Sequence, residues 1–591
     1  MRNWHWLLRV SLAGLLACGP ASLPSSPGAT DNSRIDLQPH PPDTDDISQV
    51  DEGDVPPVDT GTREDPGPGA YPPVQTRVPV LELWISPEHL AWLDAHPTSD
   101  ESVPAVVVLD GQRAPCQVRY RGASTRELPQ KSFDVDLDKG YELEDRDHFE
   151  LLASWYDSGK LSEKFAVDLY TALGLPVPRA RYVRVSLNGR HNGLYLDMEH
   201  VGKDYLKHHG LERDASIYRC GHRNCELTLQ TGPHQTGFEK KTQKDTGHAD
   251  LDAFLAWVNR SDDAEFEAKL ERFVDVEAYL GNLAADMLIS NNIIEDARGY
   301  WIHEPVKDRW QYTPWDLNNA RMFHWRTWMP EDPPITTRWP QSFSLYDPWV
   351  QRIYETRVAQ RPAHRPTWNV LNTRIWDRPA LRARLLAKLE AALAGPFSEA
   401  RAQAHLDALQ AVAGPQMAED PYASPEHVAR ARDFLGTYVR ERRAFLLKTL
   451  PALHAHGSGP LVIHEVSAGS SGYVELYNRG TVALSLEGHE LTNDLRATSR
   501  APLPALTLQP GQRLRLIADG NTSAGPTHLP FTLSREGGEV GLFDGKRLSD
   551  SGGPRVYAPE DAVFYGPLPR GTVYGRKTPR SEDFERRPLA R

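Results

Sequence analysis

The first half of the folded region alternates between apolar and polar residues in the way that strands do. Val78–Ile85 places an apolar side chain at nearly every second position, which predicts a strand with one buried face. Similar runs are Val103–Leu109, Gln117–Arg121, Ser132–Leu137, Tyr182–Leu187 and Gly193–Met198. The last two runs flank Asn188-Gly189, the strongest short signal for a hairpin turn. We therefore expect a mixed sheet up to about residue 235.

One main segment of this sheet region has the apolar spacing of a helix. Most of the chain between the sheet region and residue 450 has helical spacing too. Ser158–Leu173 carries a large apolar residue at every fourth position and ends at Gly174, a typical C-cap. Ser86 followed by Pro87 predicts a second, shorter helix start. Further helices are expected at Ala249–Asn259, Asp262–Phe273, Val276–Asn291, Pro379–Leu393, Ser398–Val412 and Ser424–Leu450. Gly299–Glu304 and Arg309–Pro314 read as a strand pair within this helical region.

The pattern changes again after Gly457-Ser-Gly-Pro460. Short apolar runs then alternate with Gly, Asn, Asp and Pro, which is typical of a β-sandwich. The predicted fold class is multidomain α+β. Its folded parts are a mixed domain over 78–455 and an all-β module over 460–591.

The N-terminus has the features of an export signal. Arg2 precedes a short apolar stretch that ends in Leu15-Leu16-Ala17-Cys18, so residues 1–17 are expected to be a signal peptide. The ending resembles a bacterial lipobox, which implies lipidation of Cys18; the alternative is a plain signal with an incidental cysteine. Residues 18–77 are rich in Pro, Ser, Gly and Asp and predict a disordered tether. The expected protein is an exported lipoprotein of the cell envelope, in the periplasm or on the outer surface.

The net charge restricts the classes of partner that the protein can bind, and the cysteines suggest a local disulfide. The formal net charge of −13 argues against nucleic-acid binding, and contact with a membrane is expected only through the lipid anchor. Cys220 and Cys225 are close enough in sequence for a local disulfide in an oxidising compartment. A reduced pair and a zinc site with His222 are the alternatives, and the zinc site lacks a clear fourth ligand.

The segment Trp310–Asn319 carries the clearest candidate chemistry. It places Asp316, Asn318 and Asn319 just after a predicted strand. Carboxylate and amide oxygens suit Mg²⁺, which usually also contacts phosphate groups. An Asx-turn that ends the strand explains the same residues without any metal. The segment alone leaves both interpretations open.

A set of short motifs in a fixed order favours the first interpretation. The motifs are Tyr120-Arg121-Gly122-Ala123-Ser124, Lys131-Ser132-Phe133, Trp155-Tyr156-Asp157-Ser158, Leu187-Asn188-Gly189, Gly193-Leu194-Tyr195 to Glu199, Tyr300-Trp301-Ile302-His303 and Pro314-Trp315-Asp316-Leu317. In this order they resemble the spore coat protein H (CotH) kinase family of atypical, secretory protein kinases. The resemblance covers about residues 78–450. It implies a two-lobed, kinase-like domain that binds ATP and Mg²⁺.

The resemblance also implies roles for particular residues. Lys131 is placed near phosphate as a catalytic cation, and Arg121 is a candidate phosphate clamp. Glu199 is expected to pair with a lysine or help to hold metal, and Trp310 to stack against adenine. Asp316 is expected to bind the metal, with Asn318 beside it.

Two positions depart from the family's pattern. The family more often has an acid where this chain has Asn318, and a neutral amide is a weaker ligand. Isoleucines at 293 and 294 stand where a catalytic acid is first sought, so Asp296, and after it Glu295, is the replacement. The departure leaves a catalytically inactive pseudokinase as the alternative to an active enzyme.

The C-terminal module resembles a lamin-tail domain, an immunoglobulin-like sandwich. The matching motifs are Ile463-His464-Glu465-Val466, Gly472 to Asn478, Leu508-Gln509-Pro510-Gly511 and Leu529 to Ser534. The expected protein is therefore a tethered kinase that phosphorylates Ser or Thr of an exported or envelope protein. The alternative is a cell-surface binding protein with an inactive kinase fold. A metal-dependent hydrolase has less support, because the histidines are scattered along the sequence.

Overall fold

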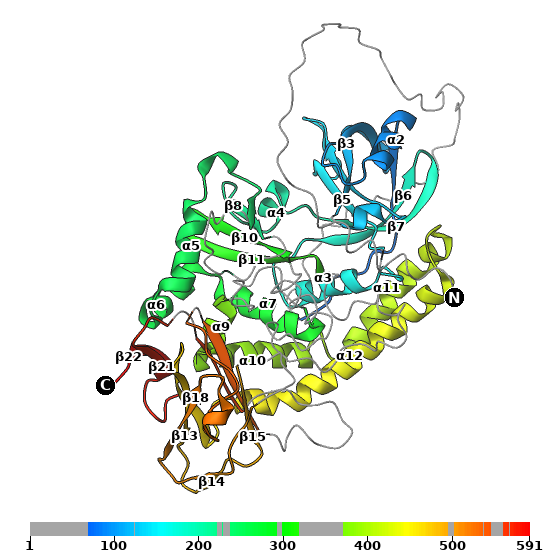
Figure 1. The fold of residues 1–591 in the computed structure, drawn as a ribbon. Coiled ribbons are helices and arrows are strands. Elements are labelled where there is room, and N and C mark those ends of the chain that lie inside the picture. Colours follow the sequence, from blue (N-terminus) through cyan, green and yellow to red (C-terminus); the bar gives the residue numbers. More distant parts are fainter. Residues whose placement is uncertain are drawn as a thin grey trace, which may run out of the picture. The chain divides into compact units, whose positions relative to one another are not determined.

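The computed structural model describes residues 69–122, 124–155, 157–220, 227, 237–291, 298–317, 370–493, 501–535, 537–544, 560–565 and 568–590. These residues belong to one compact unit, Asp59–Arg591. Figure 1 shows its elements in chain order, from the blue N-terminal strands to the red C-terminal ones. The predicted signal peptide lies outside the described residues, as does nearly all of the predicted tether. Among the described residues, no helix combines the length and apolar composition needed to cross a bilayer.

The N-terminal strands close into a barrel (Figure 1, blue and cyan). Its strands are β1 (Val80–Ile85), β2 (Val103–Leu109), β3 (Gln112–Arg121), β4 (Ser132–Leu137), β5 (His148–Leu152), β6 (Ala180–Leu187) and β7 (Arg190–Met198). They follow the order β1-β2-β3-β4-β5-β7-β6. All neighbours are antiparallel except β1 and β6, whose parallel pairing closes the ring. Inward-facing side chains such as Val118, Phe133 and Phe149 fill the interior.

Local signals fix the turns around this barrel. Asn188 (φ 50°) and Gly189 (φ 75°) both adopt the left-handed conformation that a type I′ turn requires, so the predicted β6–β7 hairpin is confirmed. The hydroxyl of Ser86 accepts a hydrogen bond of 3.1 Å from the amide of His89. This bond caps α2 (Pro87–Ala95), as the Ser-Pro pair predicted.

An ionic cluster lies where β5, β6 and β7 meet. The Asp197 carboxylate, with 1% of its side chain exposed, is 2.7 Å from Arg146 and 2.9 Å from Arg181. Glu144 binds Arg181 from the outside at 2.6 Å. A buried carboxylate is tolerated when several donors compensate its lost hydration, and two guanidinium groups do so here.

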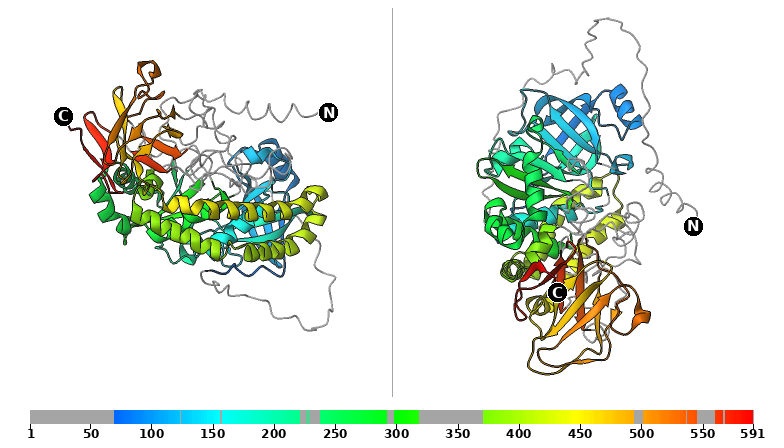
Figure 2. Two further views of the ribbon diagram at one scale, coloured as in Figure 1. Left: turned by 90° about the horizontal axis from the view of Figure 1, so that it is seen from below. Right: turned by 60° about the vertical axis from the view of Figure 1, so that its left-hand side comes forward.

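Most of the remaining chain up to residue 454 is helical. The helices are α3 (Ser162–Ala172), α4 (Lys203–His208), α5 (Ala249–Arg260), α6 (Asp263–Phe273), α7 (Val276–Ile289), α9 (Val370–Trp376), α10 (Pro379–Ala394), α11 (Glu399–Glu419) and α12 (Pro425–His454). α11 and α12 lie side by side as an antiparallel pair, which Figure 2 shows in green-yellow and yellow. α3, α7 and the long helices share one apolar core with the outer faces of β6 and β7.

A small antiparallel sheet packs against this core. Its order is β11-β10-β8-β9, formed by β8 (Ser216–Cys220), β9 (Phe238–Lys240), β10 (Arg298–Glu304) and β11 (Arg309–Trp315). β10 and β11 pair in register from Arg298 opposite Trp315 to Glu304 opposite Arg309. The predicted strand pair is therefore confirmed, and Asp316 follows directly at its end.

The turn between α11 and α12 is held against the barrel by a close approach at Gly193. The Asp420 carboxylate accepts a 2.8 Å hydrogen bond from the amide of Leu194. A Cβ at Gly193 would overlap this carboxylate and the side-chain amide of Gln130. Gly193 also has φ +104°, a conformation that favours glycine.

We expect Gly193→Ala to lower the free energy of unfolding by roughly 2–3 kcal/mol, because backbone strain and steric overlap add. The matched control is Gly210→Ala, at φ +64° with nothing within 4 Å of its Cβ. The control should lose only the roughly 1 kcal/mol of left-handed backbone strain. Urea denaturation of both variants provides the measurement, and equal losses would contradict the close-approach argument.

After residue 460 the described strands form antiparallel sheets with a core of their own. One sheet has the order β18-β13-β12-β21-β22 and another β16-β15-β19-β20, with β14 paired to β17. The strands are β12 (Leu461–Ser467), β13 (Gly472–Asn478), β14 (Leu484–Ser485), β15 (His489–Thr492), β16 (Ala501–Pro502), β17 (Thr507–Leu508), β18 (Arg513–Ala518), β19 (Gly538–Asp544), β20 (Asp561–Tyr565), β21 (Thr572–Arg576) and β22 (Phe584–Pro588). The classification of this module as an immunoglobulin-like sandwich stays a prediction.

Candidate functional site

Polar and charged side chains gather on the outer face of the barrel. The β3–β4–β5 register places Arg119 opposite Asp134, and Asp134 opposite Glu150. Because side chains alternate along a strand, Arg121 lies on the same face as Arg119. The residues between them, such as Tyr120, point into the barrel core. Strand alternation therefore brings together charges from three strands.

Arg121 and Glu150 form the centre of this face. Their nearest atoms, Nη2 and Oε2, are 2.7 Å apart, and only 16% and 6% of the two side chains are exposed. The other oxygen of Glu150 is 2.7 Å from Nδ1 of His200. Burial alone would raise the pKa of Glu150, but the Arg121 charge and the bond to His200 lower it to about 2. Glu150 is therefore a carboxylate at neutral pH.

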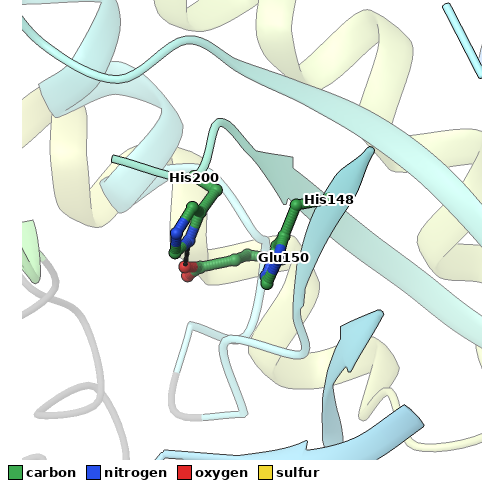
Figure 3. Close-up of side chains that lie close together, drawn as sticks. All are labelled: His148, Glu150 and His200. Atoms are coloured by element: carbon green, nitrogen blue, oxygen red, sulfur yellow. Dashed lines mark hydrogen bonds and ion pairs between the residues drawn. The ribbon is translucent and has the colours of Figure 1, made fainter. Parts of the chain in front are cut away.

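His148 extends the cluster on the same face, as Figure 3 shows. Its Nε2 is 2.6 Å from Oδ1 of Asp134, and its ring stacks on that of His200 with centroids 4.0 Å apart. Burial alone would lower the pKa of His148. The nearby carboxylates of Asp134 and Asp136 outweigh burial and raise this pKa to about 9.

Two further carboxyl groups, those of Glu163 at the start of α3 and Asp316 at the end of β11, act on Arg121 and on each other. Asp157 accepts hydrogen bonds of 3.0 and 2.7 Å from the amides of Leu161 and Ser162, and thereby fixes the start of α3. Glu163 follows in the first turn, is 2% exposed, and accepts a 3.1 Å bond from the hydroxyl of Ser154. Burial, and after it the negative charge of Asp316, raises the pKa of Glu163 to about 8.

Asp316 interacts electrostatically with both Glu163 and Arg121. It has φ 60°, the left-handed conformation that Asp tolerates better than most residues, at the end of β11. The preceding residue, Trp315, has its ring centroid 5.8 Å from the Arg121 guanidinium carbon. Burial would lower the pKa of Arg121, whereas the charges of Glu150, Asp134 and, to a smaller extent, Asp316 raise it. Arg121, Glu163 and Asp316 thus form one electrostatic group, which we call the Asp316 site.

Lys131 does not belong to the Asp316 site, contrary to the sequence prediction. It directly precedes Ser132, which pairs with Arg121, so its side chain leaves the opposite face of the sheet. Its Nζ donates a 2.7 Å hydrogen bond to the carbonyl of Arg126 and lies over the ring of Tyr120. Lys131 therefore lies on the barrel-core side of the sheet, near Asp94 and Glu127, and not on the face that carries Glu150.

Glu199 is also placed differently from the prediction, for the same geometric reason. His200 faces Glu150, so the preceding Glu199 faces away from it. Glu199 accepts bonds of 2.5 Å from Nδ1 of His208 and 3.0 Å from the amide of Arg179. Its partners are histidines and backbone, and it joins the end of β7 to α4 instead of pairing with a lysine.

Trp310 is part of the core. Its side chain is 3% exposed, and its ring stacks against those of Phe254 and His303 at centroid distances of 4.5 and 4.6 Å. These contacts cover the apolar surface that a base would need. The expected adenine stacking at Trp310 is therefore not supported by the structure.

Other predicted residues lie outside the described part of the chain: Cys18, Cys225, Asp296 and Asn318. Their predicted roles stay predictions. Cys220 is disulfide-bonded, and its pairing with Cys225 likewise stays a prediction. Cys116 is a free, buried cysteine of the barrel.

The C-terminal end of α7, which leads toward Asp296, is held by a buried acid. Asp286 Oδ1 accepts hydrogen bonds of 2.5 Å from the Tyr170 hydroxyl and 2.8 Å from the Asn291 amide. Its Oδ2 has no hydrogen-bond partner in the described structure. Burial raises the pKa of Asp286 to about 7, although both hydrogen bonds act to lower it.

This raised pKa predicts a particular pH dependence of stability. The folded state holds the Asp286 proton up to about pH 7, whereas the unfolded chain releases it near 3.8, so the contribution to stability falls as pH rises between these values. Asp286→Asn removes the penalty. We expect its unfolding free energy relative to wild type to increase by roughly 2–4 kcal/mol from pH 4 to pH 7.5. Urea denaturation across this range tests it, and a constant difference would contradict it.

Comparison with known proteins decides the family. The sequence model described as "CotH kinase protein" matches residues 118–446, more than half of the 591 residues. The chain belongs to the CotH kinase family. The matched region contains Arg121, Glu150, Glu163 and Asp316, and it ends before the C-terminal sheets. The lamin-tail assignment of those sheets stays a prediction.

Two similar proteins show the range of this relationship. The inner spore coat protein H of Bacillus subtilis (strain 168) is 23% identical over 389 residues, which cover 64% of this chain and 99% of that protein. The crystal structure of the Helicobacter pylori proinflammatory kinase CtkA is 11% identical with a TM-score of 0.25, covering 59% of this chain and 92% of that one. This TM-score is below the level at which two folds are regarded as the same.

Sequence reasoning missed Glu150, Glu163, His148 and His200. His148 and Glu150 are two residues apart on one strand, a spacing that places both on one face. This spacing is visible in the sequence, but it indicates a shared face only once residues 148–152 are known to form a strand. Glu163 is in the first turn of a predicted helix, where an acid is ordinarily explained by the helix dipole.

Proposed function

We propose that this chain is an exported, lipid-anchored protein kinase that binds Mg-ATP and transfers phosphate to Ser or Thr hydroxyls. The acceptor in this proposal is an envelope or exported protein. The observation that carries it is the Asp316 site, in which two carboxyl groups and a guanidinium group from separate elements converge in a member of a kinase family.

The donor set suits a magnesium ion. Mg²⁺ is usually held by one or two carboxylates together with phosphate oxygens. Burial and the charge of Asp316 together raise the pKa of Glu163, as expected of a buried acid near a like charge, and the Arg121 charge acts in the opposite direction. When bound, Mg²⁺ and ATP supply the phosphoryl group and neutralise the charge that develops on it.

The protein's own residues position this chemistry. Arg121 presents a planar guanidinium that binds phosphate oxygens as a fork, and Glu150 holds it in place. A cation oriented by a carboxylate is also the arrangement that protein kinases use beside their phosphates. Asp157 fixes the first turn of α3 and with it the position of Glu163. Asp296 is the proposed base for the acceptor hydroxyl, and the C-terminal module the proposed adhesion or targeting unit.

A second function is favoured by the sequence around Asp296. Isoleucines at 293 and 294 stand where the family's acid is expected, and Asn318 replaces a second acid. In this alternative, the chain is a cell-surface binding or structural protein with a pseudokinase fold. It binds Mg-nucleotide weakly or not at all and transfers no phosphate.

The deciding experiment measures Mg-ATP binding and phosphate transfer by the full chain. Asp316→Asn is compared with Asp308→Asn, because both positions have left-handed φ values (60° and 50°) that Asn tolerates. Asp308 lies in the β10–β11 turn, with 43% of its side chain exposed. We expect Asp316→Asn to lower the transfer rate by roughly 10²- to 10³-fold and Asp308→Asn to leave it unchanged.

Two outcomes would count against the proposal. Undiminished transfer by Asp316→Asn would remove the metal assignment from Asp316. Absence of nucleotide binding by wild type at millimolar Mg-ATP would favour the binding-protein alternative.

A further inference from the structure

His148, Glu150 and His200 meet on the barrel face because of strand register. His148 and Glu150 are two residues apart on β5 and therefore share a face. Glu150 pairs with Met198 of β7, so His200, two residues beyond Met198, lies beside His148. Figure 3 shows the three side chains pointing toward one another. One ligand atom from each lies within 4.8 Å of those of the other two.

We propose that these three residues bind a divalent transition metal of the zinc class. Two imidazole nitrogens and one carboxylate oxygen are a common zinc ligand set, and three protein ligands leave a fourth position for water. Imidazole ligands also distinguish this site from the carboxyl groups of the Asp316 site, since Mg²⁺ prefers oxygen ligands. The inference is independent of the proposed kinase function, because metal binding is measured without nucleotide.

The residues around the three ligands provide the outer support that metal sites need. A metal-binding histidine ordinarily uses its other ring nitrogen to bond a carboxylate, and Asp134 is 2.6 Å from Nε2 of His148. A metal-binding carboxylate is itself hydrogen-bonded, and Arg121 is 2.7 Å from Oε2 of Glu150. Oε1 of Glu150 faces His200, and Nδ1 of His148 lies 3.7 Å from Oδ1 of Asp136, a contact that metal binding at Nδ1 replaces.

Exposure and geometry allow the metal to enter. Glu150 is 6% exposed, whereas the His148 and His200 side chains are 17% and 29% exposed, so the site opens toward solvent on the histidine side. Zinc bonds of about 2.0–2.2 Å bring donor atoms to roughly 3.3 Å from one another. The two imidazole rings stack at 24°, so they must rotate apart to point their nitrogens at one ion. The short His200–Glu150 bond of 2.7 Å is exchanged for two bonds to the metal.

The first test is calorimetric titration of the chelator-treated full chain with zinc chloride. We expect one zinc per chain at this site, with affinity lowered roughly 100-fold or more in His148→Ala and in His200→Ala. His454→Ala is the matched control, because His454 is 46% exposed and pairs only with Glu390 on the helical surface. Asp134→Asn, which alters the support and keeps all three ligands, should weaken binding by roughly 10- to 100-fold.

A spectroscopic test uses wild-type protein alone and so does not depend on whether the variants fold. Co²⁺ in place of zinc should give visible bands of a four- or five-coordinate nitrogen and oxygen site, without the near-ultraviolet band that a thiolate ligand produces. A thiolate band would place the metal on a cysteine and overturn the proposal. Absence of zinc binding by wild type, or unchanged binding by the His148→Ala/His200→Ala double variant, would also overturn it.

Discussion

Arg121→Met is expected to lower the rate of phosphate transfer by roughly 10²- to 10³-fold. The guanidinium interacts with both Asp316 and Glu150. Loss of a preorganised charge that binds the transferring phosphoryl group has an effect of this size. Single-turnover transfer from Mg-ATP by the full chain measures it. A rate within a few-fold of wild type would remove Arg121 from the catalytic machinery.

A double variant separates this role from a structural one. Arg121→Met alone leaves Glu150 buried without its guanidinium partner, which costs roughly 3–5 kcal/mol of stability. Arg121→Met combined with Glu150→Met removes both charges and should recover most of that stability. If Arg121 acts only by holding Glu150 and the fold, the double variant regains activity. We expect it to regain stability and to remain inactive.

Arg576→Met is expected to lower the free energy of unfolding by roughly 3–5 kcal/mol. Nη2 of Arg576 is 2.7 Å from Oδ2 of Asp561, and both side chains are 1% exposed. Arg576 also donates to the carbonyl of Ile463 at 2.9 Å, and Asp561 accepts from the Ile463 amide at 2.8 Å. The pair joins β21 of one C-terminal sheet to β20 of the other, so its loss leaves a buried, uncompensated carboxylate.

The same module offers a control with the same residue type. Arg513 forms a 3.2 Å pair with Glu475, but its side chain is 47% exposed. Arg513→Met should therefore cost no more than about 1 kcal/mol. Differential scanning calorimetry of the two variants gives the comparison. Equal losses would mean that burial does not govern the strength of these pairs.

Much of the fold could be predicted because its elements are encoded locally. The β6–β7 hairpin, the α2 cap and most helix positions follow from turn residues and apolar spacing. The prediction for α11 stopped at Val412, before Gly414 and Pro415, because these residues usually end a helix. The helix continues to Glu419, since Met417 is buried and Gln416 bonds Arg184 of the barrel. Tertiary contacts outweigh local preference there.

The site was harder to predict because it depends on register. The order of motifs singled out Arg121 and Asp316, which the structure places in electrostatic contact, but it gave no information on which face each strand residue uses. Lys131 and Glu199 each precede a residue whose side chain lies on the Glu150 face. A shift of one residue along a strand reverses the side chain's direction, so both side chains leave the opposite face. Glu150 and Glu163 join the site through β4–β5 pairing and helix packing, which a sequence alone does not display.

Closure of the barrel limits how the acceptor of the proposed kinase can be recognised. Several classes of peptide-binding domain hold a partner's chain as an added strand, which requires a free sheet edge. The parallel pairing of β1 with β6 removes that edge from the barrel. In the β11-β10-β8-β9 sheet, Asp275 already bonds the carbonyl of Trp310 on β11. In the proposed kinase, the barrel therefore cannot hold an acceptor as an added strand, and we expect acceptor specificity at the barrel to follow side-chain chemistry rather than an extended backbone conformation.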